Sequence, residues 1–298
     1  MSDLPTWARD IVCNPPPRGD GLNHWLMRAC LALRRCGRTE REILAELPIL
    51  TAGEAIKHGE IERAVTRSKE YFDNNGDNMP RAEKWPALDK EARARIVAAC
   101  PADVAELWEQ SPYRFDDDEP LTESIIDRLF PGNPLICAAP IFNEYETAPR
   151  ESFRGRLAEF QFIVPSAMSK AVGLTQEGNE SARCLDNTGP RQYIIVEQDS
   201  GTANEQAAVI MHLAERAPLA LVVRSGGKSL HSWFICGEQS ELTVLCFFRY
   251  AVTLGADRAT WTRCQLVRMP DGTRRRDDGT TTRQSVLYWN PGNMEAVA

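Results

Sequence analysis

The chain has 298 residues, of which 43% are hydrophobic, and a formal net charge of -7. This length allows one large domain or two ordinary ones with a sizeable core. No apolar run approaches the roughly 20 residues that a membrane-spanning helix needs. The first residues, Met1 to Pro5, lack the basic and then apolar layout of a secretory signal. We therefore expect a soluble, cytoplasmic protein with no membrane partner.

Nine cysteines are scattered along the chain, and some lie inside apolar segments, as Cys246 does. Their odd number and their settings indicate reduced core thiols rather than disulfides. No two of them have the C-x-x-C spacing, which disfavours a zinc site.

The negative net charge argues against a nucleic-acid-binding protein, but the charges are unevenly distributed. The segment from Arg249 to Arg283 contains eight arginines and four aspartates, a local net charge of +4. A local patch of this kind is sufficient to face phosphates. An exposed hairpin rich in arginine, without a nucleic-acid partner, explains the charge alone equally well.

Residues 1–75 have the pattern of a small helical bundle. Apolar residues between 23 and 68 recur at spacings of three and four, and Gly37 suits a helix C-cap. Thr39 and Glu42 have the spacing of a capping box. We predict a helical accessory domain at 1–75.

Residues 76–129 are predicted to be a linker and helical connector. The polar stretch from Asp73 to Met79 suits a linker, and helical segments follow at 89–99, 102–110 and 121–129. The acidic run Asp116–Glu119 could suggest a metal site. A solvated loop that caps the next helix is the favoured interpretation.

The remainder, 130–298, turns to loops and strands, with early strands near 134–137 and 160–165. The central unit then alternates in the order β-α-β-β-α-β. Its segments are the strand 192–199, the helix 204–216, the strands 219–224 and 231–236, the helix 238–254 and the strand 263–269.

This order is that of the split βαβ unit in ferredoxin-like and RRM-like folds, in which the first and third strands are central neighbours. Glu197 and Asp199 end the first strand and are two residues apart, so they point to the same face. The topology therefore predicts that both acids lie near His231 at the start of the third strand. The predicted class is α+β, with an N-terminal helical bundle and a C-terminal RRM-like domain.

Together with Asp257, the two acids could hold one or two divalent cations, because hard cations prefer oxygen ligands. The alternative is that Glu197 and Asp199 are simply solvated at the end of a buried strand. Spacing alone does not separate the two interpretations.

The turn Ser225–Ser229 is similar to a phosphate loop. A P-loop would need glycine at position 222, where Val222 stands, and a helix next, whereas residues 232–235 have the pattern of a strand. We therefore reject a P-loop NTPase. A turn with two glycines between strands can still cradle phosphate through backbone N–H groups, aided by Lys228 and His231. An ordinary hairpin turn is the alternative.

These residues carry a family resemblance. The acids at the end of the strand 192–199, the run Ser225–His231 and Asp257 after an apolar helix resemble the three motifs of the archaeo-eukaryotic primase superfamily, in the subgroup found on phages and plasmids. The likeness extends over about 130–291. Residues 14–65 also resemble the small helical domain that often accompanies primases of mobile elements.

The resemblance implies roles for individual residues. Catalysis falls to Glu197, Asp199, His231 and Asp257, and the three acids would bind Mg²⁺ or Mn²⁺. The incoming nucleotide would contact Ser225, Gly227, Lys228, His231 and Arg268, and the template phosphates would contact Arg263, Arg274, Arg275, Arg276 and Arg283. The first motif begins with Glu197 where many relatives have Asp, and the chain has no zinc-binding cysteine set.

The resemblance thus implies a DNA primase-polymerase of a mobile element, with nucleoside triphosphates and a single-stranded DNA template as partners. The chain has no helicase motif, so a separate helicase or replication initiator is expected to unwind the DNA. Two alternatives stay open. One is a non-catalytic nucleic-acid-binding replication protein on the same fold, and the other is a metal-dependent nuclease that uses the same acids.

Overall fold

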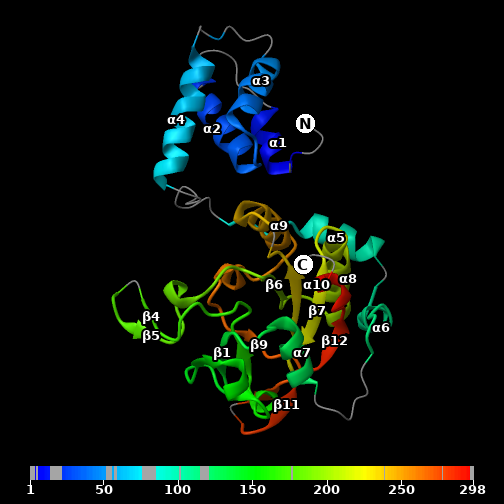
Figure 1. The fold of residues 1–298 in the computed structure, drawn as a ribbon. Helices are drawn as coiled ribbons and strands as arrows, with labels where there is room; N and C mark the ends of the chain where they lie inside the picture. Colours follow the sequence, from blue (N-terminus) through cyan, green and yellow to red (C-terminus); the bar gives the residue numbers. More distant parts are fainter. Residues whose placement is uncertain are drawn as a thin grey trace. The chain divides into compact units, whose positions relative to one another are not determined.

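The structure is a computed structural model that describes residues 4, 6–13, 22–51, 56, 59–75, 85–100, 102–114, 121–175, 177–237, 239–276 and 278–295. The chain divides into two compact units: Met1–Lys84 with Ser240–Cys246, and Trp85–Gln239 with Phe247–Ala298. Helices dominate the N-terminal part and antiparallel sheets the C-terminal part (Figure 1). This arrangement confirms the predicted α+β class.

The smaller unit contains four helices built around one core. They are α1 (Thr6–Val12), α2 (Leu22–Arg35), α3 (Glu40–Leu50) and α4 (Glu60–Asn75). Leu26, Leu33, Ile43 and Leu47 are fully buried in this core. The amphipathic spacing seen in the sequence therefore supplies the packing face of each helix.

The predicted helix ends in this unit are confirmed. Gly37 has φ +75° just after α2, a left-handed conformation that suits glycine. The Thr39 hydroxyl accepts a hydrogen bond from the Glu42 N–H, and the Glu42 carboxylate accepts one from the Thr39 N–H at 2.7 Å. Helix α4 continues to Asn75, so the first residues of the polar stretch from Asp73 to Met79 are helical. The rest of that stretch, and the acidic run Asp116–Glu119, lie outside the described residues.

Helices α5 (Lys90–Ala99), α6 (Val104–Glu109) and α7 (Thr122–Leu129) belong to the larger unit. The Asp89 N–H, before α5, donates to the Thr253 carbonyl at 2.8 Å. The Leu121 N–H, before α7, donates to the Asp271 carboxylate at 2.7 Å. The segments before α5 and α7 are therefore hydrogen-bonded to the end of α9 (Glu241–Thr253) and to the segment between β9 (Val267–Arg268) and β10 (Thr273–Arg275).

The first sheet has the strand order β2-β1-β3-β9 and is antiparallel. Its strands are β1 (Leu135–Ala139), β2 (Glu146–Pro149), β3 (Phe162–Ile163) and β9 (Val267–Arg268). Ile136 and Ile163 point into the main core of the unit, and Cys137 and Phe162 face the other way into a smaller cluster. Alternating side chains thus give this sheet two different faces.

The second sheet has the order β12-β7-β8-β6 and is also antiparallel. Its strands are β6 (Tyr193–Gln198), β7 (Leu219–Arg224), β8 (Leu230–Ile235) and β12 (Val286–Trp289). Ile195 and Trp233 lie opposite each other in register and face the main core. On the other face Phe234 stacks edge-on against Phe247 of α9 (Glu241–Thr253), with ring centroids 5.0 Å apart. Helix α8 (Ala203–Ala214) connects β6 to β7.

One strand was predicted wrongly. The segment 263–269 was expected to be the fourth strand of the split βαβ unit, but only Val267–Arg268 is a strand, and it pairs with β3 of the first sheet. On the outer edge of β6, the strand that was expected there is replaced by a single antiparallel β-bridge between Gln198 and Ala256. The chain then leaves β6 because Asp257 caps the 3-10 helix η4 (Arg258–Trp261).

The larger unit also contains two hairpins: β4 (Gly173–Leu174) with β5 (Glu180–Ser181), and β10 (Thr273–Arg275) with β11 (Thr281–Arg283).

Cys30 and Cys137 are buried thiols without disulfides, as expected, and burial raises the pKa of each to about 11. Within the described ranges, no helix combines the length and the apolar character that crossing a membrane requires.

Candidate functional site

The pairing of β6 with β8 brings Glu197 and His231 together. The two residues lie directly opposite each other in the antiparallel register, and His231 Nε2 is 3.3 Å from Glu197 Oε1. His231 is only 3% exposed. The predicted proximity of the first and third strands is therefore confirmed, and it yields a largely buried His–Glu contact.

Asp257 lies on the other side of Glu197. Its backbone N–H donates to the Glu197 carbonyl at 2.9 Å, next to the bridge from Gln198 to Ala256. Glu197 is therefore flanked across the sheet by His231 and Asp257. The Asp257 carboxylate accepts a hydrogen bond from the Ala259 N–H at 3.0 Å, which starts η4. The same residue thus supplies a helix cap and the third predicted acid.

Asp199 follows the last residue of β6 and is exposed. The segment around it is held by Arg93 of α5, which sequence analysis did not single out. Arg93 donates to Gln198 Oε1 at 3.0 Å, to the Leu254 carbonyl at 2.6 Å and to the Ser200 carbonyl at 2.8 Å. These bonds join the end of β6 to the turn before Asp257. One guanidinium therefore connects the two backbone segments that carry Asp199 and Asp257.

Two glycines make room for this arginine. A Cβ on Gly255 would lie 2.6 Å from Arg93 Nη1, and Gly255 itself has φ +101°. A Cβ on Gly201 would lie 3.0 Å from Arg93 Nη2. Burial lowers the pKa of Arg93, and the negative charges of Glu205 and Asp199 oppose that shift. Arg93 therefore links two backbone segments by hydrogen bonds and places a positive charge beside Asp199.

Opposing effects act on the pKa of Glu197. Burial alone would raise it, but the hydrogen bond and charge of His231, helped by Arg268, hold the pKa below its usual value. A depressed carboxyl pKa contributes stability above the ordinary value of 4.5, and that contribution is lost as pH falls through the folded-state pKa. The ionised form of Glu197 is thus favoured at neutral pH.

We therefore expect the Glu197→Gln variant to lose less stability in acid than the wild type. The free energy of unfolding is measured in urea at pH 7 and at pH 3.5, and the decrease between the two pH values should be larger in the wild type than in the variant. Glu180→Gln, at an exposed position on β5, is the matched control and should behave as the wild type does. Equal losses in Glu197→Gln and the wild type would contradict the lowered pKa of Glu197.

The turn between β7 and β8 is closed by its own hydrogen bonds. The Ser225 N–H donates to the Ser229 carbonyl at 3.0 Å, and Ser229 Oγ donates to Ser225 Oγ at 3.0 Å. Ser229 Oγ is also 3.4 Å from His231 Nε2. Gly227 and Lys228 are exposed at the tip, whereas Ser225 is fully buried. The tip is therefore open to a ligand, but the Ser225 side chain is not.

Gln206 of α8 anchors this turn from behind. Its amide nitrogen donates to the Lys228 carbonyl at 3.1 Å, and its amide oxygen accepts from the Leu230 N–H at 2.9 Å. Gln206 is fully buried. The sequence contains no spacing that would single it out.

The predicted nucleic-acid-binding arginines have different environments. Arg274 Nη1 donates to the Ser225 carbonyl at 3.3 Å, and Arg276 Nη2 donates to the Gly226 carbonyl at 3.1 Å. Arg263 Nη1 donates to the Gly189 carbonyl at 3.2 Å, and Arg283 Nη2 donates to the buried Asp271 at 3.0 Å. Arg275 is exposed on the hairpin. Arg274 and Arg276 therefore brace the turn, while Arg275 faces outward.

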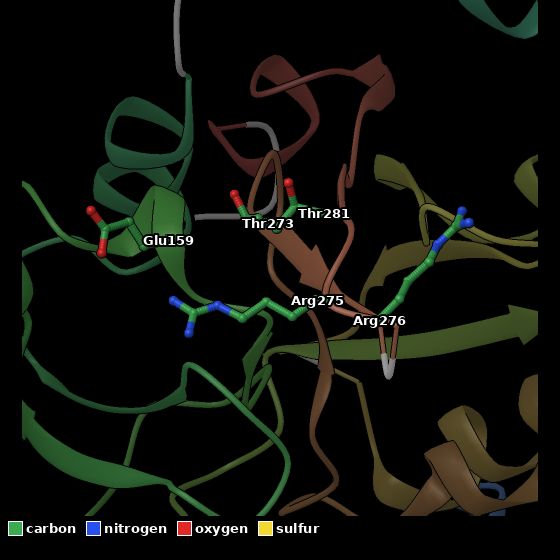
Figure 2. Close-up of a pocket in the computed structure, with 6 residues that line it drawn as sticks. Glu159, Thr273, Arg275, Arg276 and Thr281 are labelled. Atoms are coloured by element: carbon green, nitrogen blue, oxygen red, sulfur yellow. The ribbon is translucent and has the colours of Figure 1, made fainter.

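A cavity of about 460 Å³ opens beside this hairpin. It is lined by Glu159, Thr273, Arg275, Arg276, Gly279 and Thr281. Figure 2 shows that the Arg275 and Arg276 side chains leave the hairpin in opposite directions, with Arg275 extending on the side of Glu159. None of the predicted catalytic acids lines this cavity.

Arg268 lies on β9, where its charge acts on Glu197. Its guanidinium carbon is 4.7 Å from the centre of the Phe162 ring. Burial and the neighbouring Arg274 lower its pKa to about 10, against the attraction of Glu197. Among the described residues, Arg268 Nη1 and His231 Nδ1 are buried without a hydrogen-bond partner. Arg268 therefore has donor capacity that the protein itself does not use, and His231 has a ring nitrogen without a partner.

The acids fit a divalent cation in their chemistry, because carboxylate oxygens suit Mg²⁺ and Mn²⁺. Their side chains do not form a closed set. Within the described part of the chain, no group of three or more His, Cys, Asp or Glu side chains is close enough to hold a metal ion. Asp257 would have to share its carboxylate with the N–H group that it caps.

Comparison with known proteins gives no identification. No protein-family model matches the chain, and no curated protein and no solved structure matches it either.

Proposed function

We propose that this protein transfers nucleotides under the direction of a DNA template, as a primase-polymerase with an RRM-like core. The observation that carries the proposal is that Glu197 is flanked in register by His231 on β8 and by Asp257 beyond the other edge of β6. Three elements far apart in the sequence thus contribute one basic and two acidic residues to a single row. The sequence motifs named the same three residues independently.

In this proposal the basic residues bind the nucleotide's phosphates. The unpartnered guanidinium nitrogen of Arg268, together with the exposed tip at Gly227 and Lys228, is suited to oxyanions. The unpartnered Nδ1 of His231 becomes a further donor when the ring is protonated. Ser225 would shape the turn rather than contact the phosphates, because its N–H is bonded to the Ser229 carbonyl and its hydroxyl is buried against Ser229. The turn and its bracing arginines would hold the triphosphate rigidly, which favours an in-line displacement.

Glu197, Asp199 and Asp257 are the residues that would hold Mg²⁺ or Mn²⁺. Such a cation, when bound, neutralises phosphate charge and lowers the pKa of a primer 3′-hydroxyl. The protein's own part is to present carboxylates at the end of β6, and Arg93 fixes the backbone on both sides of them. Replication of a mobile element in the cytoplasm, with a separate helicase or initiator, completes the proposal.

One assay tests the proposal. The purified chain is incubated with a single-stranded DNA template, labelled ribo- or deoxynucleoside triphosphates, and Mg²⁺ or Mn²⁺. New labelled oligomers are the expected result. Shortened template without new oligomers would indicate a nuclease instead. An unchanged template and no oligomers would contradict nucleotidyl transfer.

A second candidate is a non-catalytic nucleic-acid-binding protein on the same fold. The observation that favours it is that two of the acids already have partners within the protein: Glu197 contacts His231, and Asp257 caps η4. Among the described side chains, no group of three possible metal ligands is found. This candidate is distinguished by template binding that is unaffected by Asp199→Asn and is accompanied by no synthesis.

Both candidates predict that the hairpin β10–β11 binds a single strand. Arg275→Ala should weaken binding to an oligonucleotide of thymidylate, measured by fluorescence anisotropy. In a plot of log affinity against log salt concentration, the slope is negative. Its magnitude should decrease by about 0.7 in Arg275→Ala if Arg275 contacts one phosphate. Lys170→Ala, which removes an exposed cation paired with Asp186, should leave the slope unchanged. An unchanged slope in Arg275→Ala would exclude Arg275 from the interface.

A further inference from the structure

The face of the first sheet that points away from the main core carries an aromatic pair. Phe162 and Arg268 lie opposite each other in the register of β3 and β9, and the guanidinium carbon is 4.7 Å from the ring centre. Phe142, in the loop between β1 and β2, contacts Phe162 edge-on with ring centroids 6.0 Å apart. The Phe142 side chain is 53% exposed. An aromatic ring is therefore held in a fixed orientation with much of its surface in water.

A second cation and ring lie on the same face. Arg183 is 4.8 Å from the centre of the Tyr145 ring and donates to the Cys264 carbonyl at 2.8 Å. Tyr145 packs against the same small cluster that includes Phe162. This side of the sheet thus carries two aromatic rings, each with an arginine near its centre.

This combination matches one class of ligand. A single strand of nucleic acid presents flat bases, which stack on aromatic rings, and phosphates, which pair with arginine. An apolar protein partner would leave the arginines without compensation on burial. The side chains of this face are mostly buried in a small cluster, and the Phe142 ring lies at its edge, 53% exposed. A free nucleotide would be held there by little more than one contact.

We propose that Phe142 stacks on an unpaired base of a bound nucleic-acid strand, on a platform formed by Phe142, Phe162 and Tyr145 with Arg183 and Arg268. The ligand class rests on the proposed function. Arg268 links the platform to the acids, because it stacks on Phe162 and its charge also acts on Glu197. A strand bound here would therefore pass beside the row of Glu197, His231 and Asp257.

The test uses binding without a divalent cation, so that it does not depend on catalysis. An oligonucleotide of thymidylate is titrated by anisotropy into the wild type and into Phe142→Ala and Phe142→Tyr. Loss of one stacked base should weaken binding at least about fivefold in Phe142→Ala, and Phe142→Tyr should restore it. Leu174→Ala, at a residue that is 56% exposed on the β4–β5 hairpin, should bind as the wild type does.

A direct signal comes from Phe142→Trp. Stacking on a base should quench the added indole fluorescence, measured as the difference from the wild type with its seven tryptophans. Quenching by the oligonucleotide but not by thymidine triphosphate at equal base concentration is expected. Wild-type affinity in Phe142→Ala, or quenching by the triphosphate alone, would overturn the inference even if primer synthesis is observed. Stacking without primer synthesis would leave the inference standing and contradict only nucleotidyl transfer.

Discussion

Asp199→Asn is expected to lower the rate of nucleotide incorporation by at least about a hundredfold. The carboxylate is exposed at the end of β6, where it is free to contact a cation. Losing one charged group that stabilises a phosphoryl-transfer transition state costs about 2.7 kcal/mol or more, which corresponds to that factor in rate. The measurement is the initial rate of labelled nucleotide incorporation on a single-stranded template.

The same substitution should leave the fold intact. The Asp199 side chain is exposed, and exposed substitutions usually change the free energy of unfolding by no more than about 0.5 kcal/mol. Glu180→Gln, an exposed acid on β5, is the control and should incorporate nucleotides at the wild-type rate. If Asp199→Asn incorporates nucleotides as the wild type does, Asp199 has no part in catalysis.

Arg93→Ala is expected to lower the free energy of unfolding by about 2–4 kcal/mol. The guanidinium donates to Gln198, Ser200 and Leu254, and each hydrogen bond from a charged donor contributes about 1.5–3 kcal/mol without full additivity. Urea unfolding provides the measurement. Arg93→Lys should recover only part of the loss, because an ammonium group lacks the planar fork that reaches three acceptors.

Arg95→Ala provides the matched control for Arg93. Arg95 lies on the same helix and is exposed, so its removal should change the free energy of unfolding by less than about 0.5 kcal/mol. Equal effects of the two alanine substitutions would show that Arg93 acts only through the helix and not through its contacts with the β6 segment.

The meeting of β6 and β8 could be predicted from sequence because it depends on local patterns. Each strand is a buried apolar run, and the β-α-β-β order leaves few antiparallel pairings. The proximity of Glu197 and His231 follows directly from that order of elements. The capping box at Thr39 and the turn at Gly37 were also predictable, because a few neighbouring residues determine them.

The parts that could not be predicted depend on contacts between distant residues. The fourth strand was placed wrongly because the Asp257 cap turns the chain into η4, and because β9 is only two residues long and joins another sheet. Arg93 was missed because its partners are as many as 161 positions away and no spacing marks them. The arginines of the hairpin look alike in the sequence. Only the structure shows that Arg274 and Arg276 hydrogen-bond to carbonyls of the turn at Ser225 and Gly226.

We propose that the row of His231, Glu197 and Asp257, with Asp199 at the strand end, transfers nucleotides. The most direct measurement compares the wild type, Asp199→Asn and Glu180→Gln for labelled oligomer synthesis on a single-stranded template with Mn²⁺, with urea unfolding of each protein alongside. Synthesis by the wild type and Glu180→Gln, and its loss in a fully folded Asp199→Asn, is the predicted result. The absence of synthesis in the wild type, or equal synthesis in all three proteins, would contradict nucleotide transfer by these residues.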